Sequence, residues 1–349
     1  MTKNLLLYGA NGYTGKLIIE IAATYGLQPI LAGRNAGAIM ELSEQYALPY
    51  RIGDLENAAS LDELLKDIDV VLHAAGPFSI TARPMLEACI RNKVHYLDIT
   101  GEIPVFELAK KSHEQAVAAG IMIMPGTGFD VVPTDCMALW LKQQLPDATE
   151  LSLAFANLGG GLSHGTATTM VQALGEAGLI RENGKLVPNK IGERHRVVDF
   201  GKGGWIVMSI PWGDLSTAFH TTGIPNIITY TGITHSIYRV LKLQNLFNCI
   251  LRKKWIRKKA QEYINRKPAG PTAEERKNGV SFVWGEVRNA KGEKRNGRLR
   301  GPDGYTLTAH SSLIIARKVL EGNYSPGYQT PAGCYGADLV MEVPGTEKF

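Results

Sequence analysis

Short apolar runs alternate with longer amphipathic stretches through the first third of the chain. Segment 69–74 is apolar almost throughout, which is typical of a strand buried on both faces of a parallel sheet. The predicted strands are 4–8, 28–32, 49–52, 69–74, 94–98 and 121–124. The predicted helices are 15–25, 36–46, 60–66, 79–92 and 104–119. This alternation predicts an α/β domain of the Rossmann type, with a doubly wound parallel sheet.

The pattern changes beyond residue 126, where strands and helices no longer alternate regularly. The predicted elements are strands at 151–156, 205–208 and 216–220, a basic helical stretch at 236–265, a hairpin around 289–292 and a helix at 306–322. These elements predict a second domain of the α+β type. We therefore expect a Rossmann domain over 1–130, a substrate domain over 131–304, and a segment 305–349 that packs back on the first domain.

A glycine-rich turn joins the first predicted strand to the first predicted helix, and reads Gly9-Ala-Asn-Gly-Tyr-Thr-Gly15. Glycines let a backbone turn tightly, approach a pyrophosphate and pack a helix on a strand. The helix N-terminus then offers N–H groups to the phosphates. This context predicts a dinucleotide site formed by Gly9, Asn11, Gly12, Tyr13, Thr14 and Gly15. Because strand ends face the cofactor in such sheets, Ala75, Gly76 and Pro77 should lie beside the nicotinamide half.

The end of the second predicted strand indicates which dinucleotide binds. An acidic residue is usual there in NAD enzymes, where it binds the ribose 2′-hydroxyl. This chain has Arg34 followed by Asn35, and a guanidinium pairs well with a 2′-phosphate, so we expect NADP(H). An ordinary surface arginine is the alternative. Asp54, after the third strand, has two possible roles: a hydrogen bond to the adenine or a cap on the next helix.

Composition and charge narrow the class of protein and its partners. The chain has 349 residues and is 44% hydrophobic and 20% charged, which indicates a globular fold with an ample core. Segment 239–300 holds 18 lysines and arginines against 5 glutamates, a charge of +13 that leaves −8 elsewhere. A charge so segregated suggests an anionic membrane surface, an acidic carrier protein or a phosphorylated substrate as a partner. A solvated basic face without a partner is equally compatible.

No motif for nucleic-acid recognition accompanies this charge, and a nucleic-acid partner is not expected. The cysteines are Cys89, Cys136, Cys249 and Cys334, and they form neither a CxxC pair nor a Cys/His cluster. We therefore expect no metal site and no disulfide framework. No apolar leader precedes the first strand, so the expected compartment is cytoplasmic. A homodimer is the default expectation for oligomeric state.

Several motifs occur in an order that resembles one family. They are the glycine turn, Ala75-Gly-Pro-Phe78, His95-Tyr-Leu-Asp-Ile-Thr-Gly-Glu102, Gly128-Phe-Asp-Val-Val-Pro-Thr-Asp135, Gly270-Pro-Thr-Ala-Glu-Glu-Arg276, Trp284-Gly-Glu286, Pro302-Asp-Gly-Tyr-Thr-Leu-Thr308 and Gly327-Tyr-Gln-Thr-Pro-Ala332. Together they resemble the saccharopine dehydrogenase-like oxidoreductases, in particular the branch with trans-acting enoyl reductases. The resemblance implies an NAD(P)-binding Rossmann domain and a second domain with a mostly antiparallel sheet. It does not fix the substrate.

Hydride transfer is the cofactor's reaction, so the protein must position the acceptor and supply a proton. Four residues near the expected nicotinamide or at a helix start are candidate proton donors: Asp98, Glu102, Asp130 and His164. Each also has an ordinary structural interpretation, as a turn cap, an ion-pair partner or a helix-start residue.

The sequence therefore predicts an NADP(H)-dependent oxidoreductase that reduces a C=C or C=O bond in an apolar, lipid-like small molecule. One alternative is an amino-acid or opine-type dehydrogenase acting on a C=N bond, which would need convergent arginines such as Arg181, Arg194 and Arg196. The other alternative is a protein that binds NADP(H) as a sensor or associates with lipid, without turnover.

Overall fold

The computed structural model describes residues 3–234, 236, 238–239 and 247–349, and its chain divides into two compact units. The first unit comprises Met1–Val132 with Tyr305–Cys334, and the second comprises Pro133–Gly304 with Tyr335–Phe349. Segment 305–349 was predicted to pack on the first domain, but its last part, from Tyr335, belongs to the second unit. The reason is a strand near the C-terminus, β16 (Glu347–Lys348), which pairs with β14 (Lys294–Pro302).

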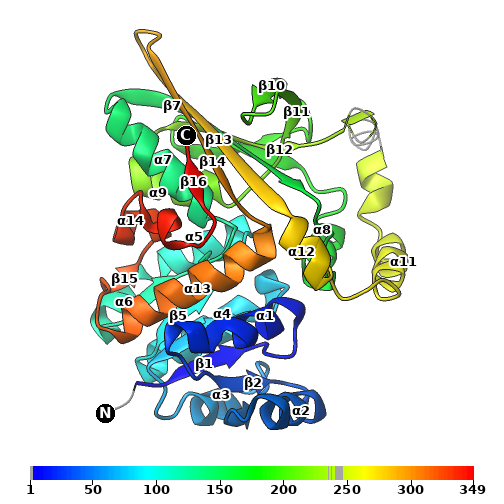
Figure 1. The fold of residues 1–349 in the computed structure, drawn as a ribbon, viewed down its shortest axis with the longest axis vertical. Coiled ribbons are helices and arrows are strands. Elements are labelled where there is room, and N and C mark those ends of the chain that lie inside the picture. Colours follow the sequence, from blue (N-terminus) through cyan, green and yellow to red (C-terminus); the bar gives the residue numbers. More distant parts are fainter. Residues whose placement is uncertain (1–2, 235, 237, 240–246) are drawn as a thin grey trace. The chain divides into compact units, whose positions relative to one another are not determined.

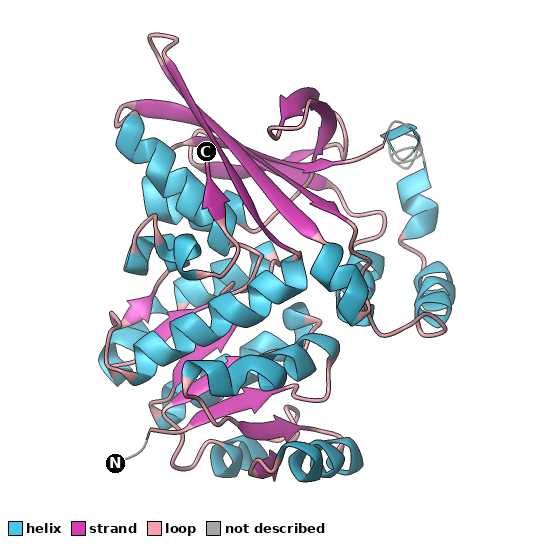
Figure 2. Cartoon of the chain, viewed as in Figure 1, coloured by secondary structure: helices cyan, strands magenta, loops and turns pink. Residues whose placement is uncertain are grey.

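A parallel sheet forms the centre of the first unit (Figure 2). The strand order is β15-β6-β5-β4-β1-β2-β3, and all of these pairings are parallel. The chain builds outward from β1 in both directions, so the order reverses between β1 and β4. The strands are β1 Leu5–Tyr8, β2 Ile30–Gly33, β3 Tyr50–Ile52, β4 Val70–His73, β5 His95–Asp98, β6 Met122–Met124 and β15 Gly327–Tyr328. The predicted doubly wound fold is confirmed.

Helices connect these strands, and a late helix returns to the same unit. They are α1 Tyr13–Ala22, α2 Ala36–Tyr46, α3 Ala58–Leu64, α4 Phe78–Asn92, α5 Ile103–Lys111, α6 His113–Ala119 and α13 Gly304–Leu320, with a short 3₁₀ turn at Ala23–Tyr25. The predicted helix 104–119 is two helices, because the backbone at Ser112 (φ −89°, ψ 6°) departs from helical values. Every residue of β1 and β4 is buried, as expected for strands covered on both faces.

The second unit contains a mixed, mostly antiparallel sheet in the order β10-β11-β12-β7-β13-β14-β16, with β8 pairing β12 and β9. The pairing of β12 with β7 is parallel, and the other pairings are antiparallel. The remaining strands are β7 Ala148–Leu158, β8 Gly178–Glu182, β9 Lys185–Asn189, β10 His195–Asp199, β11 Gly204–Ser209, β12 Asn226–Gly232 and β13 Val280–Asn289. The α+β class and the β13–β14 hairpin are thus confirmed.

The helices of the second unit include one that was predicted to be a strand. They are α7 Val132–Gln144, α8 His164–Gln172, α9 Asp214–Thr222, α11 Lys254–Ile264 and α12 Ala273–Asn278, followed near the C-terminus by the 3₁₀ turn Leu339–Glu342. The short helix α14, Pro331–Tyr335, lies where the chain passes from the first unit to the second. Segment 216–220 lies within α9, so the strand prediction was wrong. Leu215, Ala218 and Thr222 are buried at helical spacing, and Gly223 ends the helix in a left-handed conformation (φ 68°).

The predicted basic stretch 236–265 is described in part. Residues 235, 237 and 240–246 lie outside the described residues. Within the rest of this stretch, helix α11 carries most of the positive charge. Figure 1 shows α11 at one edge of the second unit, next to α8 and away from the sheet.

Candidate functional site

The glycines of the turn between β1 and α1 are required by their surroundings. Gly9 has φ +89°, and a Cβ there would lie 2.7 Å from the backbone nitrogen of Ala75. A Cβ on Gly15 would lie 2.8 Å from the carbonyl oxygen of Ala10. Side chains are therefore excluded at both positions, where the turn meets the end of β4 and the strand-to-helix junction. This cradle of bare backbone is what close approach to a pyrophosphate requires.

Helix α1 begins within this turn, with Gly12 as its N-cap and no side-chain cap on its first N–H groups. The predicted residues Tyr13 and Thr14 lie in its first turn, so they occupy the anion-binding end of the helix. The Tyr13 ring packs edge-to-face on Tyr305 of α13, with the ring centroids 5.1 Å apart. Asn11 extends toward β2, because a Cβ on Gly33 would lie 3.3 Å from its Oδ1 atom.

Arg34 follows β2 and is exposed, and among the described residues no hydrogen bond or ion pair to its guanidinium is found. Asn35 caps α2, because its side-chain oxygen accepts the Ala38 N–H at 3.2 Å. Asp54 instead closes a turn by accepting the Glu56 N–H at 3.1 Å. The helix cap suggested for Asp54 belongs to Asn57, whose side chain accepts the N–H of Ser60.

The environment of Tyr8, at the end of β1, shows that Arg34 and Asp54 lie near the same strand end. Burial and the Asp54 carboxylate raise the pKa of the Tyr8 hydroxyl to about 12, against the opposing effect of the Arg34 guanidinium. The hydroxyl donates to the Gly53 carbonyl at 3.0 Å. Tyr8 is therefore a neutral donor that orders the loop carrying Asp54.

The predicted nicotinamide segment, Ala75 to Pro77, joins β4 to α4, and Glu102 binds the start of that helix. The Glu102 carboxylate accepts the N–H groups of Phe78 at 2.8 Å and Ser79 at 2.9 Å. It therefore caps α4 from the loop after β5, where the helix dipole favours negative charge. The structure thus places Glu102 beside the predicted cofactor segment, with its oxygens committed to backbone donors.

Asp98 ends β5 and lies in the protein interior with no solvent exposure. One carboxylate oxygen accepts the N–H groups of Thr100 and Gly126, both at 2.9 Å, and the other accepts the Tyr96 hydroxyl at 2.7 Å. Burial raises the pKa of Asp98 to about 6, although these hydrogen bonds oppose the shift. The carboxylate therefore joins the loop after β5 to the loop after β6.

Asp130 follows β6 and differs from Asp98 in its contacts. Its carboxylate lies over Gly101, since a Cβ on that glycine would be 2.7 Å from Asp130 Oδ2. The residue is partly exposed, and among the described residues no hydrogen bond to its carboxylate is found. Burial raises the pKa of Asp130 to about 7. A carboxyl group with this pKa can hold and release a proton near neutral pH.

The loop that carries Asp130 is clamped by α13, a contact that the sequence did not predict. Thr308 Oγ1 accepts the Phe129 N–H at 2.9 Å, and Ser311 Oγ donates to the Thr127 carbonyl at 2.7 Å. The only signal for it was the Pro302–Thr308 motif, which had no assigned role. Because Thr308 is distant from Phe129 in sequence, only the fold brings the two together.

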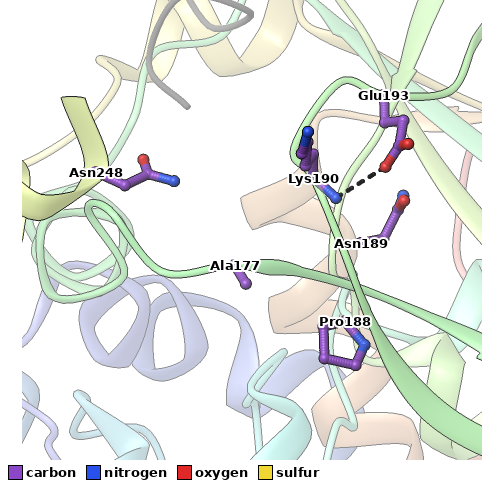
Figure 3. A pocket seen from close by; sticks show the side chains of 6 residues that line it. All are labelled: Ala177, Pro188, Asn189, Lys190, Glu193 and Asn248. Carbon is purple, nitrogen blue, oxygen red and sulfur yellow. Dashed lines mark hydrogen bonds between the residues drawn. The ribbon is translucent and has the colours of Figure 1, made fainter. Parts of the chain in front are cut away.

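His164, the fourth predicted proton donor, belongs to the second unit. It is the first residue of α8, and its Nε2 atom is hydrogen-bonded to the Lys267 carbonyl at 2.6 Å. A cavity of about 280 Å³ also lies in the second unit, lined by Ala177, Pro188, Asn189, Lys190, Glu193 and Asn248 (Figure 3). None of the predicted site residues lines it.

Two further findings concern the described part of the chain only. Its histidine, cysteine and acidic side chains form no group that could hold a metal ion. None of its helices combines the length and the apolar character needed to cross a membrane.

The parallel sheet, the bare glycine turn and the uncapped helix start define the first unit as a dinucleotide-binding domain. Residues 5–124 match the family described as the saccharopine dehydrogenase NADP binding domain. The predicted resemblance and the NADP-type cofactor domain are thereby confirmed. The glycine turn fits this cofactor, because a Cβ at Gly9 or Gly15 would fill the cradle.

Several curated proteins are similar to about half of the chain. A saccharopine dehydrogenase-like oxidoreductase of Rattus norvegicus is 29% identical over 203 residues, covering 51% of this chain and 47% of that protein. A protein named as a trans-acting enoyl reductase of Mycobacterium tuberculosis is 29% identical over 188 residues, 50% and 45% of the two chains. A lipid droplet localized protein of Caenorhabditis elegans is 26% identical over 214 residues, 54% and 49% of the two chains. The chain spans about half the length of these relatives.

A solved structure extends the fold likeness to both units. Saccharopine dehydrogenase (L-Glu forming) of Saccharomyces cerevisiae aligns with a TM-score of 0.68 over 99% of this chain and all of that one, at 14% identity. At this identity the likeness establishes the fold alone. The chain therefore shares the fold of saccharopine dehydrogenase, and residues 5–124 of its first unit are similar to the NADP-binding domain of that family.

Proposed function

We propose that the protein is an NADP(H)-dependent reductase that acts on a C=C or C=O bond of an apolar, lipid-like small molecule. The observation that carries the proposal is the pairing of the bare Gly9–Gly15 turn with an exposed arginine, Arg34, at the end of β2. When bound, the cofactor supplies or accepts the hydride. The residues of the chain have three tasks: to hold the phosphates, to select the 2′-phosphate and to move a proton.

Arg34 would select the phosphorylated ribose. A planar guanidinium forms charge-assisted hydrogen bonds with phosphate oxygens, which a neutral hydroxyl cannot match. The position supports this role because Arg34 follows the second strand, where the adenosine ribose lies in this class of fold. The exposure of Arg34 also supports this role. Among the described residues we find no hydrogen bond or ion pair that its guanidinium would have to break to bind a phosphate.

Asp130 is the proposed proton donor. Of the three candidate carboxyl groups in the first unit, Asp98 is held by three donors and Glu102 by two backbone N–H groups. Asp130 retains its oxygens for a substrate and has a pKa raised to about 7 by burial. It also follows a strand at the carboxyl edge of the sheet, where the nicotinamide half is expected.

Two relatives support an apolar substrate. One is named as a trans-acting enoyl reductase, which suggests C=C reduction, and another as a lipid droplet localized protein. The alternative of an opine-type dehydrogenase finds less support. Arg181 donates to the backbone carbonyls of Leu215 and Gly184, and Arg196 pairs with Glu286 at 3.2 Å. These guanidinium groups are engaged within the second unit rather than held ready for several substrate carboxylates.

Binding of the two cofactors tests the proposal. The Kd for NADPH and for NADH would be measured in the unmodified protein, in Arg34→Ala and in Arg83→Ala, an exposed arginine on α4 that pairs with Glu87. We expect Arg34→Ala to weaken NADPH about 10- to 100-fold and NADH less than about threefold. Arg83→Ala should change neither. Equal affinity of the unmodified protein for NADPH and NADH would contradict the role of Arg34. NADPH binding without oxidation by any enoyl, ketone or imine substrate would favour a sensor.

A further inference from the structure

Helix α11 exposes an unusual set of side chains on its outer side. Trp255 and Tyr263 are 56% and 62% exposed, although aromatic residues of this size are normally buried. Lys258 and Lys259 are exposed on the same side of the helix, and Lys267 is exposed just beyond its end. We call Trp255, Lys258, Lys259, Tyr263 and Lys267 the lysine–aromatic face. Over 247–267 the chain has eight lysines and arginines against one glutamate, Glu262.

The opposite side of α11 accounts for its attachment to the second unit. Arg257 donates to the Leu174 carbonyl and pairs with Glu176, both at 2.7 Å. Gln261, one turn later, donates to Thr168 Oγ1 at 2.9 Å. The helix is thus held to α8 and the segment after it by polar contacts on the inner side, and the two exposed aromatic rings are not needed for that packing.

The lysine–aromatic face is ordered along the helix. Trp255, Lys259, Tyr263 and Lys267 follow one another at intervals of four residues, which places neighbours on the same side of a helix. The Lys259 Nζ atom lies 5.5 Å from the centroid of the Trp255 ring, and the Lys267 Nζ atom lies 4.9 Å from that of Tyr263. Each ammonium group therefore sits over a ring while remaining in contact with solvent.

We propose that the lysine–aromatic face docks the protein on the surface of an anionic phospholipid bilayer. Trp and Tyr rings partition to the headgroup level of a bilayer, and lysines beside them bind anionic lipid phosphates. Two exposed apolar residues just before α11, Phe247 (52% exposed) and Ile250 (43% exposed), add apolar surface that could enter the headgroup region. An acidic protein partner would match the charge alone, whereas a bilayer also accounts for the exposed aromatic and apolar side chains. The docking surface does not depend on the reductase reaction.

Vesicle flotation tests the proposal with the whole protein. The probes are phosphatidylcholine vesicles with and without about one third phosphatidylglycerol. The variants are Trp255→Ser/Tyr263→Ser and Lys258→Gln/Lys259→Gln. The matched control, Lys291→Gln/Lys294→Gln, removes the same charge from two exposed lysines of the β13–β14 hairpin. Circular dichroism and urea unfolding, measured alongside, report that each variant is folded.

The unmodified protein should float with anionic vesicles and not with neutral ones. Each variant of the lysine–aromatic face should lower the vesicle partition coefficient about tenfold or more, and the hairpin control should leave it unchanged. Brominated lipids should quench tryptophan fluorescence in the unmodified protein and much less in Trp255→Phe. Absence of binding, equal binding to neutral vesicles or unchanged binding of both variants would overturn the proposal. Binding to soluble polyglutamate but not to vesicles would assign the surface to an acidic macromolecule instead.

Discussion

Two neighbouring loops of the first unit each carry a buried or partly buried carboxyl group, and they use it differently. Asp98, after β5, accepts three hydrogen bonds and has no exposure. Asp130, after β6, is partly exposed, and we find no such bond to it within the described residues. Burial raises the pKa of both. The comparison teaches that a raised pKa at a strand end identifies a candidate catalytic acid. The hydrogen-bond donors around the carboxylate then show whether it has a structural role or is available for proton transfer.

The largest expected effect is on turnover, and it concerns Asp130. Asp130→Asn should lower kcat by about 10²- to 10⁴-fold, because the amide cannot supply a proton to the reduced substrate. Below about pH 4, where the carboxyl group is protonated, the free energy of unfolding should change by less than about 1 kcal/mol, since no hydrogen bond that we find is removed. Steady-state kinetics and urea unfolding would measure the two effects. If Asp130→Asn retains most of the kcat, Asp130 is not the proton donor, and the proposed functional difference from Asp98 is contradicted.

The next effect is on stability, and it concerns Asp98. Asp98→Ala leaves the N–H groups of Thr100 and Gly126 and the Tyr96 hydroxyl without their acceptor. Each unsatisfied buried group costs about 1 to 3 kcal/mol, so the free energy of unfolding should fall by about 3 kcal/mol or more. Urea unfolding would measure the loss, with Asp130→Ala as the matched control. Equal losses in the two variants would erase the distinction between the two carboxylates.

The sequence predicted the features of the fold that depend on local sequence patterns. The glycine turn, the alternation of strands with helices and the position of Arg34 follow from motif and periodicity, and the first unit confirms the fold that they indicate. Segment 216–220 failed because its short, polar-containing run fits a strand period as well as a helical one. Its helical nature becomes visible only with the left-handed Gly223 that ends α9.

The hydrogen-bond partners of the candidate proton donors could not be predicted from the sequence. The Asp98 carboxylate meets Gly126, which is 28 positions later in the chain. Glu102 reaches back to the helix start at Phe78, 24 positions earlier. Such bonds depend on which strands are neighbours and on how the loops after them fold. The sequence could therefore name the acidic residues but could not tell a helix cap from a candidate acid.

A third prediction uses pH to compare the two carboxyl groups. Both have pKa values above the usual 3.8, about 6 for Asp98 and about 7 for Asp130. A group with a raised folded-state pKa stabilises the protein fully below its unfolded pKa, and this contribution is lost as the pH rises through the folded pKa. Stability should thus fall between about pH 4 and pH 7, by about 2 to 3 kcal/mol for Asp98 alone.

The two groups should lose their contributions over different pH ranges. Asp98 should complete its loss near pH 6, while that of Asp130 should continue to about pH 7. Asp130→Asn should therefore flatten the upper part of the stability profile, measured by urea unfolding across this range. If the variant and the unmodified protein have parallel profiles between about pH 6 and pH 7, Asp130 does not titrate there.

The smallest expected effect concerns the clamp on the Asp130 loop. Thr308→Val removes the oxygen that accepts the Phe129 N–H and keeps the shape of the side chain that packs beside Gly128. The free energy of unfolding should fall by about 1 to 2 kcal/mol, the cost of one unsatisfied buried donor. Because Phe129 immediately precedes Asp130, kcat should fall as well, by several-fold rather than by the factor expected for Asp130→Asn.

Thr308→Ser is the matched control, since it retains the hydroxyl oxygen while losing the methyl group. If the clamp acts through the hydrogen bond, the serine variant should restore kcat but recover only part of the stability, because the methyl contact with Gly128 is lost. If kcat is as low in Thr308→Ser as in Thr308→Val, the effect comes from the packing of α13 rather than from the hydrogen bond. A valine variant with unchanged kcat would show that the Asp130 loop keeps its geometry without Thr308, so that only the strand and Gly101 would position the proposed acid.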